Sequence, residues 1–128
     1  MKNRMMWNCE RDGCFNVLKR PKLEHLSEAL PGKCAFGDVD GIAEINGYGL
    51  LLEWKAEPVA LSEGQRIMYE RLTRSKILTV LVIAGDARSM VISHVAHFFR
   101  GKWTGWQASS LDGVRTAIRS WVAWTDKP

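Results

Sequence analysis

The chain has 128 residues, 46% hydrophobic and 25% charged, which suits one globular domain, residues 1 to 128, and disfavours a second. No stretch reaches the roughly 20 apolar residues that span a bilayer, and the first residues lack the apolar run of a signal peptide, so we expect a cytoplasmic protein with no membrane partner. The formal charge of +4 suits attraction to phosphate, but many proteins without a nucleic-acid partner are as basic.

The first half of the chain predicts an irregular arm, a helix and three extended runs. Residues 1 to 18 show no clear periodicity, and a helix is expected from Pro21 until Pro31-Gly32 ends it. Asn46-Gly47 is a strong hairpin signal, because both residues tolerate the positive φ of a type I′ turn. The extended runs that form the expected β-meander are residues 34 to 36, 39 to 45 and 49 to 55.

The second half predicts a helix, a buried strand, a weaker strand and a last helix. The helix begins near Ser62 and ends near Arg74, and the aliphatic run at residues 77 to 84 is typical of a central strand covered on both faces. A weaker strand at residues 89 to 99, a loop and a helix from Ser110 follow. This order predicts an α/β or α+β fold with a mixed sheet flanked by helices.

Three residues of the expected hairpin point to metal chemistry. Side chains two apart in a strand share a face, so Glu53 and Lys55 project together and Trp54 projects away. A two-residue turn also pairs Asp40 directly with Glu53. Two facing carboxylates repel unless a cation lies between them, and oxygen ligands with waters are what Mg²⁺ prefers. Lys55 could then orient a water and counter charge in the transition state.

The run Gly37-Asp38-Val39-Asp40-Gly41, followed by Leu52-Glu53-Trp54-Lys55, resembles the signature of the PD-(D/E)XK nuclease superfamily. The resemblance covers residues 21 to 84 and implies the restriction-endonuclease-like αβββαβ core, here with an extra C-terminal strand and helix. It implies that Asp40, Glu53 and the carbonyl of Trp54 bind metal and that Lys55 is catalytic. The implied cofactor is Mg²⁺, for which Mn²⁺ is expected to substitute.

Two further acidic residues are candidate ligands. The proline of the signature is absent, so the choice between Asp38 and Asp40 stays open. We favour Asp40 because of its hairpin pairing, although Asp38 points to the same face in an ideal strand. Glu24 on the first helix resembles the extra acidic residue of many members, and an ordinary exposed helix Glu explains it equally well.

Gln65 and Tyr69 resemble the Gln-x-x-x-Tyr motif of the exonuclease branch, found on the helix after the Glu-x-Lys strand. Residues four apart share a helix face, so both could meet the metal site or a phosphate, with Gln65 catalytic and Tyr69 contacting nucleic acid. The alternative is structural, since Ser62-Glu63-Gly64-Gln65 has the pattern of a capping box.

Basic residues suggest the partner. Among those that flank the first helix and crowd the second, we expect Arg20, Lys22 and Arg66 to contact nucleic acid, and solvated helix faces are the alternative. The resemblance, which extends to small phage or bacterial members and to Holliday-junction-resolvase-like nucleases, implies hydrolysis of DNA in repair, recombination or phage DNA processing, in a bacterium or a phage-infected host cell. A non-catalytic nucleic-acid-binding module on the same fold is the alternative function. An RNA substrate and a homodimer also stay open.

Overall fold

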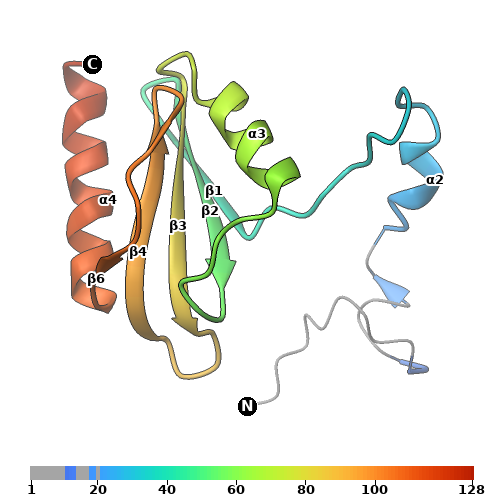
Figure 1. Cartoon of the computed structure of the whole chain (residues 1–128), viewed down its shortest axis with the longest axis horizontal. Helices are drawn as coiled ribbons and strands as arrows, with labels where there is room; N and C mark the ends of the chain where they lie inside the picture. The colour runs from blue at the N-terminus through green and yellow to red at the C-terminus, as the bar shows by residue number, and fades with distance from the viewer. Residues whose placement is uncertain (1–10, 14–17, 20) are drawn as a thin grey trace. The chain divides into compact units, whose positions relative to one another are not determined.

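The computed structural model of the chain describes residues 11–13, 18–19 and 21–128 (Figure 1). Most of the expected N-terminal arm and Arg20 lie outside these residues. The chain divides into two compact units, Met1–Asp38 and Val39–Pro128, so the expected core at residues 21 to 84 crosses their boundary.

In the first unit the structure describes the helix α2 (Glu24–Ser27). The expectation of a helix reaching Pro31 is wrong, since α2 is a single turn. None of its residues is buried, so α2 gains little from the burial of apolar surface, and isolated short helices are marginal.

The expected strand at residues 34 to 36 is also wrong, because this segment is irregular. Two of its amide groups bond within the same unit: the Cys34 N–H donates to the Pro31 carbonyl, and the Phe36 N–H donates to the Ser27 hydroxyl. Donors used locally cannot join a sheet ladder. The described residues therefore show two strands between the first two helices, where the αβββαβ order requires three.

The second unit is built on a six-stranded mixed sheet, which confirms the α/β class. The strands β1 to β5 lie side by side in chain order, and β6 pairs with β4. β2 and β3 are parallel, and all other neighbours are antiparallel. The strands are β1 (Gly41–Ile45), β2 (Tyr48–Lys55), β3 (Leu78–Asp86), β4 (Val91–Phe99), β5 (Lys102–Trp103) and β6 (Gln107–Ala108). The last two replace the loop expected after residue 99.

The hairpin of β1 and β2 has the predicted turn. Asn46 and Gly47 take φ values of 54° and 85°, as a type I′ turn requires. Ile45 pairs with Tyr48, and the ladder continues without a break to Gly41 and Leu52.

One helix covers each face of the sheet (Figure 1). The helix α3 (Glu63–Leu72) packs through Tyr69 on Val80, Val82 and Phe98. The helix α4 (Leu111–Asp126) packs on the opposite face, and β3 is buried by both helices, as the aliphatic run predicted. Among the described helices, none is long and apolar enough to cross a membrane.

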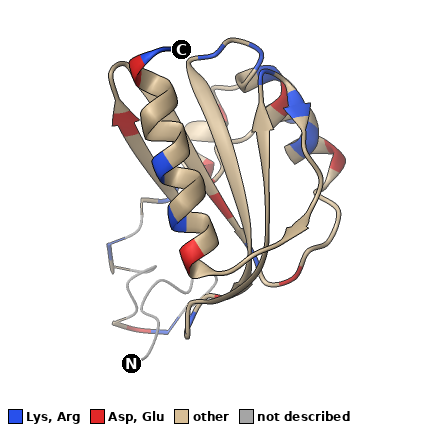
Figure 2. Cartoon of the chain, turned by 90° about the vertical axis from the view of Figure 1, so that its left-hand side faces the viewer, with Lys and Arg blue, Asp and Glu red and all other residues tan. Residues whose placement is uncertain are grey.

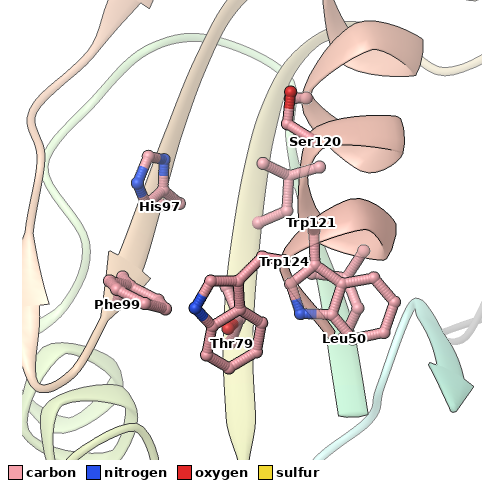
Figure 3. Close-up of a pocket in the computed structure, with 9 residues that line it drawn as sticks. Leu50, Thr79, His97, Phe99, Ser120, Trp121 and Trp124 are labelled. Carbon is pink, nitrogen blue, oxygen red and sulfur yellow. The ribbon is translucent and has the colours of Figure 1, made fainter. Parts of the chain in front are cut away.

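A pocket of about 280 Å³ lies between α4 and the sheet (Figure 3). Its wall is mostly apolar, and burial of the His97 ring there lowers the pKa of that side chain. Within the described residues, the buried Thr79 hydroxyl and the buried indole nitrogen of Trp121, both from lining residues, have no hydrogen-bond partner.

Thr79→Val is therefore expected to stabilise the protein by about 1 kcal/mol, because it removes an unsatisfied buried hydroxyl at nearly constant volume. Thermal denaturation measures the change. Thr73→Val is the matched control with the opposite sign, since the Thr73 hydroxyl donates to the Tyr69 carbonyl at 2.7 Å and accepts from the Gly101 N–H at 3.1 Å. Loss of stability in both variants would contradict the prediction.

Candidate active site

The alternation of β2 sets which side chains meet α3. Glu53 and Lys55 lie on the α3 face, where they contact residues of that helix. Trp54 lies on the α4 face, where its indole N–H donates to the Gly85 carbonyl at 3.1 Å. The sequence predicted this division correctly.

Glu53 is a buried carboxylate, 8% exposed, that accepts hydrogen bonds on both oxygens. The Gln65 amide donates to Oε1 at 2.8 Å, and the Tyr69 hydroxyl donates to Oε2 at 3.0 Å. Gln65 and Tyr69 are four residues apart on α3, so one helix face supplies both donors. The Gln-x-x-x-Tyr spacing thus fixes the orientation of Glu53.

Gln65 also fixes Lys55. The Lys55 amine donates to the Gln65 side-chain oxygen at 2.9 Å and lies 3.5 Å from Glu53 Oε1. A single amide therefore bridges the carboxylate and the amine, using its donor on one and its acceptor on the other. The sequence indicated that Gln65 could face the site but not that it links these two side chains.

Asp40 lies at the open edge of this cluster. The hairpin ladder ends at Gly41 paired with Leu52, so the expected pairing of Asp40 with Glu53 lies one residue beyond it and stays a prediction. Its Oδ2 accepts from the backbone N–H of Trp54 at 2.6 Å. Asp40 itself is exposed, so its remaining oxygen can reach solvent or a bound ion.

Tyr69 reports the electrostatics of the cluster. Burial raises the pKa of its hydroxyl, and the charge of Glu53, the hydrogen bond to Glu53 and the charge of Asp40 raise that pKa further. Tyr69 therefore remains a neutral donor at physiological pH. Tyr69 is 6% exposed, and its hydroxyl is bonded to Glu53, so little of this residue is open to a nucleic acid. The direct contact with nucleic acid that the sequence suggested for Tyr69 stays a prediction.

The capping motif at the start of α3 is present, but it does not use the Gln65 side chain. The Ser62 hydroxyl accepts from the Gln65 backbone N–H at 3.2 Å, as an N-cap does. The side-chain amide of Gln65 instead reaches Glu53 and Lys55. Helix capping and the cluster therefore use different atoms of the same residue.

Gln65→Glu is expected to lower stability by about 1 to 3 kcal/mol at neutral pH, since a second carboxylate would replace the amide that donates to Glu53. A capping role alone predicts unchanged or slightly higher stability, because Glu serves as well there. Urea denaturation of this variant decides between the two. Ser62→Ala is the control that removes the cap, with an expected loss of about 1 kcal/mol, and leaves the Gln65 side chain in place.

Glu24, Lys22, Asp38 and Arg66 are the other predicted site residues that the structure describes. Glu24, Lys22 and Asp38 belong to the first unit. Arg66 is on α3, where it forms an ion pair with Glu70 at 2.8 Å. Among the described residues, no group of three or more His, Cys, Asp or Glu side chains is arranged to hold a metal ion. Asp40 and Glu53 are the two carboxylates whose charges raise the pKa of Tyr69.

A pair is enough for the ion that the sequence suggested. Mg²⁺ is commonly held by one or two carboxylates, with water and substrate phosphate completing its ligands. Asp40 and Glu53 supply carboxylate oxygens, and the Lys55 amine lies 3.5 Å from Glu53 Oε1. The donor set therefore fits magnesium.

No family model, curated protein or solved structure matches the chain. What the protein does is therefore inferred from the chemistry of this cluster.

Proposed function

We propose that the chain is a magnesium-dependent nuclease of the PD-(D/E)XK type, with a restriction-endonuclease-like arrangement of its β1–β2 hairpin, that hydrolyses phosphodiester bonds in DNA. One observation carries the proposal: Gln65 bridges the buried Glu53 carboxylate and the Lys55 amine, and Asp40 lies near enough for its charge to raise the pKa of the Tyr69 hydroxyl that bonds Glu53. Carboxylates that can hold a metal ion, with an amine beside one of them, suit metal-assisted hydrolysis of a phosphodiester.

Asp40, Glu53 and the Trp54 carbonyl would hold the ion. The N–H and the carbonyl of one residue in a strand point to the same side, and the Trp54 N–H points to Asp40. The Trp54 carbonyl therefore points to the side of β2 on which β1 lies. Because β1 begins only at Gly41, this carbonyl lies past the start of β1 and beside Asp40. When bound, Mg²⁺ supplies Lewis-acid polarisation of a phosphate oxygen and acidifies a water ligand.

Lys55 would act on the reacting groups. Its ammonium group has three donors, of which Gln65 accepts one, so others remain for an attacking water or a phosphate oxygen. Its positive charge counters the negative charge that develops on the phosphorus-bound oxygens. Gln65 and Tyr69 are positioning residues in this scheme, since they hold Lys55 and Glu53 in place before substrate arrives.

The test is cleavage of labelled duplex, single-stranded, flap and four-way-junction DNA, and of RNA, with Mg²⁺ and with chelator. We expect cleavage with Mg²⁺ that chelator abolishes. Binding of these substrates without cleavage under any metal condition would refute the nuclease and favour the alternative of a binding module on the same fold.

A further inference from the structure

The turn between β4 and β5 is seated against the C-terminal end of α3. Arg100 and Gly101 form this two-residue turn with φ values of 52° and 80°. The Gly101 N–H donates to the Thr73 hydroxyl at 3.1 Å, and a Cβ on Gly101 would lie 3.4 Å from the Arg74 side chain. Cations of two separate segments are thereby brought to one end of the helix.

We call Arg71, Arg74, Lys76, Arg100 and Lys102 the basic end. Figure 2 shows Lys and Arg gathered around the end of α3 and on adjoining loops. All its members are exposed. Arg100 lies with its guanidinium 5.4 Å from the centre of the Phe99 ring. Among the described residues, the other members form no ion pair, and the nearby Glu70 already pairs with Arg66.

Stabilisation of α3 explains only part of this group. Cations in the last turn of a helix interact favourably with its dipole, which accounts for Arg71 and Arg74. It does not account for Arg100 and Lys102, which come from a different element and add like charge to the same place. Unpaired cations concentrated on one surface are the electrostatic feature of phosphate binding.

The basic end also lies at a useful distance from the candidate active site. Gln65, which contacts Glu53, and Arg71 are six residues apart on α3, or roughly 9 Å along the helix axis. That length corresponds to about three base steps of a B-form strand. A strand that enters the site at Gln65 and follows α3 therefore reaches the basic end.

We propose that the basic end binds the phosphodiester backbone of the nucleic acid on which the candidate active site acts, about three nucleotides from the scissile bond. The substrate strand then runs along α3 from Gln65 to Arg100. This inference rests on the proposed function, which gives the strand its other point of attachment.

The test is the salt dependence of nucleic-acid binding, measured without divalent metal so that cleavage does not interfere. The variant Arg71→Gln/Arg74→Gln and the variant Arg100→Gln/Lys102→Gln each remove two cations of the basic end. Each lost phosphate contact lowers the magnitude of the slope of log K against log salt by about 0.9 for duplex DNA and about 0.7 for a single strand. We expect the slope of each variant to fall in magnitude by the amount that corresponds to the loss of one to two phosphate contacts. We also expect each variant to bind nucleic acid at least about tenfold more weakly at low salt.

Arg115→Gln/Arg119→Gln is the matched control, because it removes the same charge from exposed positions on α4, which covers the opposite face of the sheet. This control is expected to leave the slope unchanged. Equal changes in all three variants would mean that net charge alone governs binding and would overturn the proposal. Repeating the measurement with duplex DNA, single-stranded DNA and RNA shows which of these backbones the basic end binds.

The same data separate this inference from the proposed function. If the wild-type chain cleaves DNA but both variants have the same salt-dependence slope as the control, the proposed role of the basic end is wrong and the proposed nuclease function is unaffected. If both variants have reduced slopes but the wild-type chain shows no metal-dependent cleavage, the basic end binds nucleic acid and the proposed nuclease function is wrong. A wild-type chain that binds none of the three nucleic acids refutes both.

Discussion

Asp40→Asn is expected to reduce magnesium-dependent cleavage by on the order of a thousandfold without loss of stability. The Asn side-chain oxygen can still accept from the Trp54 N–H, so the substitution removes the charge and keeps the hydrogen bond. Because the charge of Asp40 acts on the same Tyr69 hydroxyl as the charge of Glu53, removing it should leave stability without metal unchanged or higher. Single-turnover cleavage gives the rate, and thermal denaturation with and without Mg²⁺ gives binding, since an ion bound to the native state raises the melting temperature.

Three comparisons sharpen this result. Asp112→Asn makes the same change at an exposed position on α4 and is expected to leave cleavage unchanged. Asp38→Asn decides between the two aspartates and is expected to cause a milder loss than Asp40→Asn. Glu53→Gln should abolish cleavage but also cost stability, because Glu53 accepts from Gln65 and Tyr69 and the Gln amide would face those donors. Full cleavage by Asp40→Asn would remove it from the metal site.

Lys55→Met is expected to lower the single-turnover rate by on the order of a hundredfold or more, with Mg²⁺ and DNA binding nearly unchanged. Met keeps the length of the stem and removes the ammonium, so the loss reports charge and donors rather than packing. Lys55 acts on the water and the transition state in the proposed scheme, so ground-state affinity should be little affected.

The control for Lys55 is Lys127→Met, an exposed lysine after α4 whose substitution should leave rate and binding unchanged. DNA affinity is measured with metal under conditions in which the variant does not turn over. A wild-type cleavage rate in Lys55→Met shows that the assignment of this lysine is wrong. A large loss of DNA affinity at an unchanged rate would instead make Lys55 a phosphate-binding residue.

The sequence determined the parts of this protein that depend on local conformation. Asn46-Gly47 specifies a type I′ turn, and that turn sets the register that pairs Gly41 with Leu52, the neighbours of Asp40 and Glu53. Period-two alternation then assigns Glu53 and Lys55 to one face. The start of α3 at its Ser62 cap was predictable for the same reason, because an N-cap depends on neighbouring residues only. The apolar run of β3 was visible in the sequence, although its burial comes from α3 and α4 on the two faces of the sheet.

Only the tertiary structure decided how separate segments meet. Residues 34 to 36 have an extended pattern, yet their amides bond locally and no sheet edge takes them. The bridge from Glu53 through Gln65 to Lys55 depends on how α3 lies on the sheet, and no spacing in the sequence specifies that packing. The place of the Arg100-Gly101 turn beside Thr73 depends on it too. Local preferences fix each element, whereas contacts between elements are set by burial of their apolar faces, which many arrangements of the same pattern could satisfy.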